Sequence, residues 1–207
     1  MKILNKYSLK DILLQMLAII IMGFGCGMLI KTGYGADTSN ALFTGISNVT
    51  GLTPGTINAL GSLVFTIIVF FLSRKRIGLG TLLVPLLVGF PVDIAISIWF
   101  KAPNLISGII IDIISLYIIS IGAAIIIEFE LGASPYDGMA LAIADIFNLR
   151  FFIAKYILDG FCVIVGYLLK GEVGIGTLLC FLVMGIFISF NRKVLRKIEN
   201  KISTKKS

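Results

Sequence analysis

Residues 105–127 read LISGIIIDIISLYIISIGAAIII, an apolar run that contains a single charged residue, Asp112. An α-helix rises about 1.5 Å per residue, so a helix of this length crosses the roughly 30 Å hydrocarbon core of a bilayer. A helix that is apolar on all sides is stable in lipid or in the core of a large protein, and this chain is small. The stretch therefore predicts a transmembrane helix.

Further apolar stretches follow the same pattern on both sides of this one. The chain has 207 residues, of which 57% are hydrophobic and 14% are charged, whereas soluble domains have about 25% charged residues. We expect an all-α, polytopic membrane protein that forms a single membrane domain over residues 1–207 and contacts the lipid bilayer. Its six predicted transmembrane helices cover residues 12–30, 56–72, 79–100, 105–127, 151–169 and 175–190.

The formal net charge of +7 comes from basic residues that flank the apolar runs. This placement is typical of membrane topology signals, so nucleic acid is not expected as a partner. With the N-terminus inside, fourteen Lys and Arg residues fall on the cytoplasmic side and three fall outside. This asymmetry predicts that both termini are cytoplasmic. Residues 192–207 form a predicted basic cytoplasmic tail, which suits the anionic headgroups of a membrane surface.

Two connections are more than plain loops. Residues 33–55 read GYGADTSNALFTGISNVTGLTPG, and residues 132–150 read GASPYDGMALAIADIFNLR. Each has a glycine-containing turn, an acid and polar residues suited to an N-cap, followed by a mildly apolar segment (37–50 and 135–149) too short to span a bilayer. Two alternatives stay open for each segment: a helix lying on the membrane surface, or a broken half-helix aimed into the protein.

The two halves of the chain repeat a pattern. GLGTLL at 78–83 recurs as GIGTLL at 174–179, with five of six residues identical. Each half, about 12–100 and about 105–191, contains three predicted spanning helices and one short segment. Because three is odd, the halves are expected to insert in opposite orientations, as in inverted-repeat transporters. The glycines predicted to serve turns or helix packing are Gly33, Gly78, Gly80, Gly89, Gly132, Gly174, Gly176 and Gly185.

Polar side chains in and beside the apolar runs are the candidate ligand-binding residues, since a charge inside a membrane costs about 2.5–3.5 kcal/mol on insertion scales. Asp159 lies four residues after Lys155, so the two can pair on one helix face; the alternative is that Asp159 couples to a proton or cation. The N-termini of the short helices favour a small polar or anionic ligand, although the acids there compete with it. The candidate substrate-binding residues are Asp37, Thr38, Asn58, Asp93, Ser134, Pro135, Asp137 and Asp159.

The sequence offers no constellation for enzyme chemistry. It has no histidine, and its three cysteines all lie within apolar runs. A free cysteine inside an apolar segment commonly serves as a small buried apolar residue. We therefore predict no catalytic residues, no metal site and no cofactor, and we expect that the protein is not an enzyme.

Five segments carry a resemblance to a known family. They are GFGCGMLIKTGYGADTSNALFTGIS, TGLTPGTIN, SRKRIGLGTLL, LVGFPVD and LGASPYDGMALAIA. In order and spacing they resemble the YczE/YyaS/YitT-type bacterial integral membrane proteins, over roughly residues 19–190. The resemblance implies a multi-pass protein of the bacterial plasma membrane, in a family whose biochemical activity is largely undefined. Thr38 departs from the family pattern, which often has proline there, whereas Pro135 and Asp137 keep the G-x-x-P-x-D turn.

Three functions remain open at this stage. A small-molecule or ion transporter predicts a polar cavity at the midplane, lined by both short segments. A substrate-binding membrane subunit of an uptake complex predicts a deep outward pocket and a surface for a protein partner. A non-transporting accessory protein that assists a partner predicts a packed apolar centre. The transporter is the favoured hypothesis, and a homo-oligomer or a membrane protein partner fits any of the three.

Overall fold

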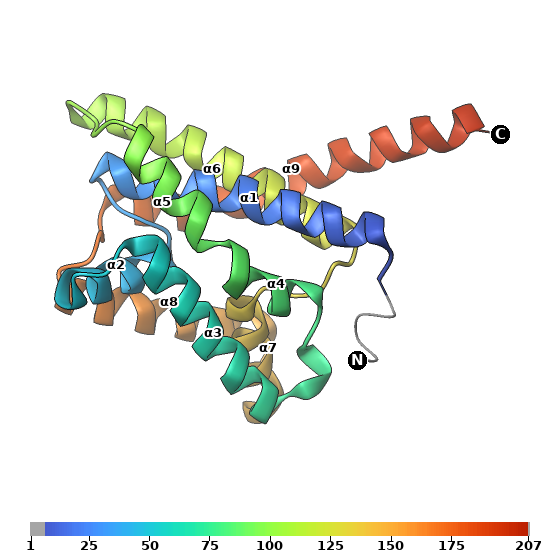
Figure 1. The fold of residues 1–207 in the computed structure, drawn as a ribbon, viewed down its shortest axis with the longest axis horizontal. Coiled ribbons are helices and arrows are strands. Elements are labelled where there is room, and N and C mark those ends of the chain that lie inside the picture. The colour runs from blue at the N-terminus through green and yellow to red at the C-terminus, as the bar shows by residue number, and fades with distance from the viewer. Residues whose placement is uncertain (1–6, 207) are drawn as a thin grey trace.

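The computed structural model describes the backbone of residues 7–206 and the side chains of residues 7–198. Within this part of the chain every regular element is a helix, which confirms the all-α class (Figure 1). The helices are α1 (Leu9–Thr32), α2 (Thr38–Thr50), α3 (Pro54–Leu72), the 3-10 turn Arg74–Arg76, α4 (Leu79–Leu87), α5 (Gly89–Ile98), α6 (Leu105–Glu128), α7 (Pro135–Phe147), α8 (Phe151–Leu168) and α9 (Ile175–Lys206).

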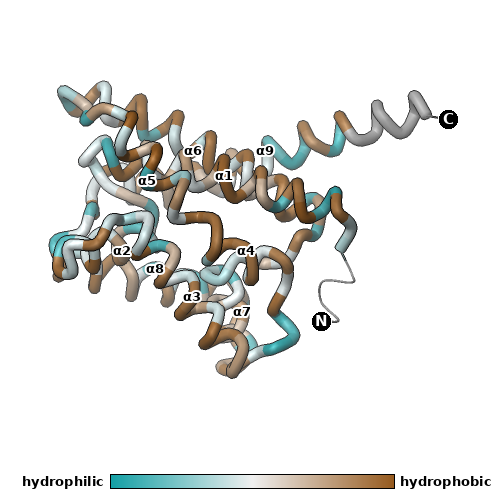
Figure 2. The backbone as a smooth tube through the Cα atoms, in the orientation of Figure 1, coloured by the Kyte–Doolittle hydropathy of each residue, from teal (hydrophilic) through white to brown (hydrophobic). Residues whose placement is uncertain are grey.

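The helices are long and apolar enough for a multi-pass membrane protein. Among the described residues, α1, α3, α6, α8 and α9 each satisfy the length and hydropathy of a spanning helix, and α4 with α5 makes a sixth if the pair is counted as one bent span. Figure 2 shows hydrophobic residues along these helices and hydrophilic ones at the turn before α4. Large apolar side chains lie exposed on α3, α8 and α9, which is the surface that lipid covers.

The expected helix over residues 79–100 is wrong in one respect, because it is two helices. α4 and α5 meet at Val88 and are bent by 42°. Pro91 has no N–H to donate to the preceding turn, so the helical ladder is interrupted there. The break also brings the backbones of Gly89 and Gly55 into close contact, which joins α5 to α3.

α1 and α6 form the most extensively packed helix pair and run antiparallel along one side of the molecule (Figure 1). Glycines make their close approach possible. A Cβ on Gly25 would stand 3.0 Å from the Ser115 carbonyl oxygen, and a Cβ on Gly122 would meet Met22 and the Ala18 carbonyl. α5 packs on α1, and α9 packs on α6. Small residues at such crossings are the usual means of helix association in membranes.

The two short helices begin inside the protein and run to opposite ends of it. At its start α2 contacts Asp159, the middle residue of α8, and near its end Asn48 donates to the Lys170 carbonyl beyond α8. α7 begins beside the same Asp159 and ends where Asp145 pairs with Arg76. The hydrogen bond from Arg76 holds the pKa of Asp145 below its usual range, against the opposing effect of burial. The geometry favours the inward-directed alternative over a surface helix.

The repeated GxGTLL segments each pack on the turn of the opposite half. Gly80 N–H donates to the Leu131 carbonyl at 3.2 Å, and Gly176 N–H donates to the Tyr34 carbonyl at 2.9 Å. The turns themselves require glycine, because Gly33 and Gly132 have φ of +77° and +92°. Such values strain residues that carry a Cβ.

α9 is longer than expected. Its helix does not stop near Phe190 but continues through the predicted tail to Lys206, and Figure 1 shows it projecting beyond the rest of the protein. Arg192 and Arg196 both pair with Glu128 at the end of α6. These ion pairs fix the first turns of the predicted tail to the membrane domain.

Gly185 corrects one sequence expectation. It was predicted to be a packing glycine because it corresponds to Gly89, yet nothing lies within 4 Å of the position that a Cβ would occupy there. The reason is that this part of α9 faces open space, because Gly185 is exposed and lines a cavity between the helices.

We predict that Gly89→Ala destabilises the protein and that Gly185→Ala does not. A Cβ on Gly89 would stand 2.6 Å from the Gly55 carbonyl oxygen, and overpacking of this kind typically costs about 1–3 kcal/mol. At Gly185 alanine gains helix propensity, about 1 kcal/mol at most. Thermal unfolding in detergent, followed with a thiol-reactive dye, tests the pair. Equal midpoints for the two variants would contradict the close packing of α3 on α5.

Candidate functional site

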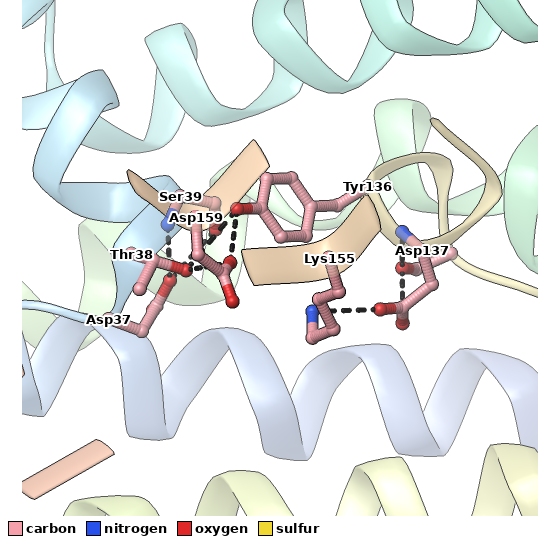
Figure 3. A network of polar contacts seen from close by, with 8 residues as sticks. Asp37, Thr38, Ser39, Tyr136, Asp137, Lys155 and Asp159 are labelled. Carbon is pink, nitrogen blue, oxygen red and sulfur yellow. Dashed lines mark hydrogen bonds and ion pairs between the residues drawn. The ribbon is translucent and has the colours of Figure 1, made fainter. Parts of the chain in front are cut away.

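A partly enclosed cavity of about 930 Å³ lies between the starts of α2 and α7. Residues of α1, α3, α4, α6, α8 and α9 complete its walls. Its polar groups gather where the two short helices meet α8 (Figure 3). Binding sites of small molecules usually combine apolar walls with a few placed polar groups in this way.

Asp159 is the residue that both short helices share. Its Oδ1 accepts from Thr38 Oγ1 of α2 at 2.7 Å and from the Tyr136 hydroxyl of α7 at 2.5 Å (Figure 3). Within the described residues its second oxygen, Oδ2, has no hydrogen-bond partner, although it is not sealed from the cavity. One carboxylate oxygen is therefore structural, and the other is available to a ligand.

Asp37 has a different task, because it caps α2. Its Oδ1 accepts from the backbone N–H groups of Ser39 and Asn40, each at 3.1 Å. Its Oδ2 accepts from the Asn40 amide at 2.6 Å and faces the Cys26 thiol at 3.6 Å. An N-capping carboxylate is stabilised by the donors and by the positive end of the helix. This acid is therefore largely satisfied by the protein itself.

Lys155 pairs with Asp137 and not with Asp159. The ammonium lies 3.1 Å from Asp137 Oδ1 and 4.7 Å from the centre of the Tyr136 ring. The pairing expected from the four-residue spacing is thus replaced by one between α8 and α7. Ser134, the N-cap of α7, donates to the other Asp137 oxygen and holds the acid in place.

Aromatic and apolar side chains make up most of the remaining wall. Apolar contributions come from α1, α4 and α6, including Met22, Val84 and Ile119. The aromatic side chains that line the cavity are Phe43, Phe65, Tyr136, Phe151, Phe152, Tyr156 and Phe181.

Seven of the eight candidate binding residues line this cavity, and Asp93 does not. Asn58 reaches it from α3 and donates to the Asn40 side chain at 2.7 Å. Pro135 opens α7, and Asp37, Thr38, Ser134, Asp137 and Asp159 lie as described above. Asp93 instead accepts from Thr53 Oγ1 and Gly55 N–H at the start of α3. It fixes a turn outside the cavity.

Sequence reasoning missed Tyr136 and the polar Asn40. Tyr136 is the second residue of α7, directly between two candidates, but an aromatic residue beside a proline carries no signal of its own. Asn40 lies in segment 37–50, for which the sequence did not decide between a surface helix and a helix directed into the protein. Among the side chains described, no group of three or more Cys, Asp or Glu is arranged to hold a metal ion.

Comparisons with known proteins agree with the resemblance noted in the sequence. A family model described as "Family of unknown function (DUF6198)" matches residues 9–193. The chain is 28% identical over 179 residues to the "Uncharacterized protein YyaS" of Bacillus subtilis, covering 83% of this chain and 87% of that protein. It is 28% identical over 191 residues to an "Uncharacterized protein" of Haemophilus influenzae, covering 92% and 87%. No solved structure matches.

We predict that Asp159→Ala lowers the thermal stability more than Asp159→Asn does. Asparagine keeps an oxygen that accepts from Thr38 and Tyr136, whereas alanine leaves both hydroxyls without it. An unsatisfied buried polar group costs about 1–3 kcal/mol. Unfolding midpoints of both variants in the same detergent provide the measurement. If alanine and asparagine were equivalent, Asp159 would not be the link between α2 and α7.

Proposed function

The chain belongs to a family of unknown function, DUF6198, and from the geometry of its cavity we propose that it transports a small amphipathic organic cation across the bacterial plasma membrane. The observation that carries the proposal is the meeting of two inward-directed short helices at one carboxylate in a cavity. Transporters commonly place their substrate sites at such broken helices.

The arrangement of the halves supports an inverted-topology repeat. α1 packs on α5 as α6 packs on α9, and α2 packs on α8 as α7 packs on α3. The two GxGTLL segments also make corresponding hydrogen bonds to opposite turns. In this proposal α2 and α7 are re-entrant half-helices, and rocking of one half against the other exposes the cavity to each side in turn.

The proposed orientation places both termini in the cytoplasm. The 74–76 cluster, Arg150 and the basic residues after Asn191 then share the inner side, as the positive-inside rule requires. Lys31, Lys101 and Lys170 face outward. Thus α2 runs toward the outer surface and α7 toward the inner one.

Charge argues for a cation as the ligand. The helix N-termini alone would attract an anion, but Asp37 and Asp137 already occupy those positions. Lys155 forms its ion pair with Asp137. Asp159 therefore makes no ion pair within the described residues, although the Lys155 ammonium still acts on it electrostatically. A bound ammonium group would supply that ion pair.

The aromatic wall suits the same ligand. A cation over an aromatic ring gains roughly 0.5–2 kcal/mol, and quaternary ammonium groups are recognised by aromatic cages. Lys155 already occupies a face of the Tyr136 ring, so the ligand cation would lie against the other aromatic side chains of the wall. The apolar residues beyond the ring would hold the ligand's hydrocarbon part.

The test uses phenyltrimethylammonium, a permanently charged probe, and benzoate as an anionic counterpart. We expect the purified protein to bind the cation and not the anion in calorimetry, and proteoliposomes to take up the radiolabelled cation. Asp159→Asn should weaken binding roughly tenfold or more, because interactions of charged groups are worth about 1.5–3 kcal/mol.

Asp93→Asn is the matched control, since this acid lies outside the cavity, and it should bind as the wild type does. Preference for benzoate, or equal binding by Asp159→Asn, would refute the cation site. Binding without uptake would turn the assignment toward the substrate-binding subunit of a larger complex.

A further inference from the structure

A second buried carboxylate lies outside the cavity, at the place where the first turn meets α9. Asp112 of α6 is fully buried. Its Oδ1 lies 2.8 Å from Thr32 Oγ1, and its Oδ2 has no partner at all among the described residues. Oδ2 faces the start of α9, where a Cβ on Gly176 would stand 2.8 Å away from it.

The hydrogen count at Thr32 favours a protonated Asp112. The Thr32 hydroxyl has one hydrogen but two acceptors within reach, the Leu29 carbonyl at 2.7 Å and Asp112 Oδ1 at 2.8 Å. A hydroxyl donates once and accepts from others. If Asp112 carries the proton, it donates to Thr32 and Thr32 donates to Leu29, so both bonds form together. If Asp112 is ionised, its Oδ1 and the Leu29 carbonyl compete for the one hydrogen of the Thr32 hydroxyl.

Charges nearby do not offset an ionised form. The titratable groups within a few residues of this contact along the chain are Lys31 at the end of α1, Tyr34 in the turn and Glu172 before α9, and Lys101 precedes α6. None of them forms a hydrogen bond or ion pair with Asp112 in the described structure, where Thr32 is its one partner. A buried charge without a partner is costly, so burial favours the neutral acid.

The corresponding contact in the first half is occupied by a neutral side chain. Gln15 of α1 is also fully buried, and both of its side-chain polar atoms lack partners. Its Nε2 stands 3.1 Å from where a Cβ on Gly80 would lie. Gly80 and Gly176 are the same position of the repeated GxGTLL segment. The site thus accepts an uncharged polar group in both halves, but only Asp112 is able to acquire a charge.

Asp112 is covered by the contact between the turn at residues 33–37 and α9. Gly176 N–H donates to Tyr34, Ala36 N–H donates to the Glu172 carbonyl at 2.7 Å, and Gly35 lies against Thr177. Water reaches Oδ2 only if this contact separates. The turn leads directly into Asp37 and α2, which form a wall of the cavity.

We propose that Asp112 is a proton-binding site that is neutral while the turn of residues 33–37 rests on α9, and that loss of its proton to water during a transient separation of this contact keeps the contact open. The ligand is a proton, and no group other than the carboxyl takes part in the transfer: the O–H bond breaks and the proton leaves to water. The inference concerns this chain's conformation and does not depend on which molecule the cavity takes.

Infrared difference spectroscopy of the protein in nanodiscs tests the protonation. The wild type should show the carbonyl band of a protonated carboxylic acid at mildly acidic pH, and the band should disappear as the pH is raised. Asp112→Asn should abolish it, and Asp93→Asn should leave it. Thr32→Val keeps the acid but removes its acceptor, so the band should shift in frequency. Absence of the band in the wild type, its persistence in Asp112→Asn, or an unshifted band in Thr32→Val would each overturn the assignment.

Hydrogen–deuterium exchange tests the opening. At one alkaline pH, at which the wild-type band has gone, the peptide covering residues 33–37 should exchange several-fold faster in the wild type than in Asp112→Asn. Both proteins are compared at the same pH, so the intrinsic pH dependence of exchange cancels. Equal exchange rates would show that loss of the proton does not open the contact.

Discussion

The hydrogen bonds that Asp159 Oδ1 accepts from Thr38 and Tyr136 hold the centre of this protein together. They are the point at which α2, α7 and α8 meet. Two helices that begin inside a membrane protein have unpaired N–H groups in their first turns, and lipid provides no hydrogen-bond acceptors for those groups. Asp37 and Ser134 satisfy some of them by capping. Asp159 then joins the two starts, and the cavity follows from that junction.

The same constraint explains why carboxylates and aromatic rings surround one space. Polar groups needed to end a helix within the membrane have to be paired with one another or with water, because unpaired polar groups in hydrocarbon cost several kcal/mol. Lys155 is drawn to Asp137 for this reason. Three acids of the cavity differ in their partners. Asp37 caps α2, Asp137 pairs with Lys155, and Asp159 uses one carboxylate oxygen in hydrogen bonds.

Much of the architecture could be predicted from hydrophobic run length, since the apolar stretches correspond to the spanning elements within a few residues. The break at Val88 was not predicted, and the path of the chain beyond it depends on the contact of Gly89 with Gly55. Seven of eight candidate binding residues reach one cavity. Five of them lie at the starts of the two short helices, and Asp159 is a charged residue of a spanning helix, which has to face inward. Asp93 lies outside the cavity, and Lys155 pairs with Asp137, because spacing along one helix says nothing about which neighbouring helix offers a closer group.

Each GxGTLL segment donates a backbone hydrogen bond to the turn in the other half of the chain, and this exchange of contacts affects the order in which the protein can assemble. The Gly80 N–H has its acceptor only after Leu131 has been synthesised, and the Tyr34 carbonyl has its donor only after Gly176 has been synthesised. The start of α9 is synthesised after α1, so the Tyr34 carbonyl lacks its donor until that segment has been made and inserted. A variant chain truncated ahead of Glu172 and α9 would leave this carbonyl and the Ala36 N–H without the partners that they have in the complete contact.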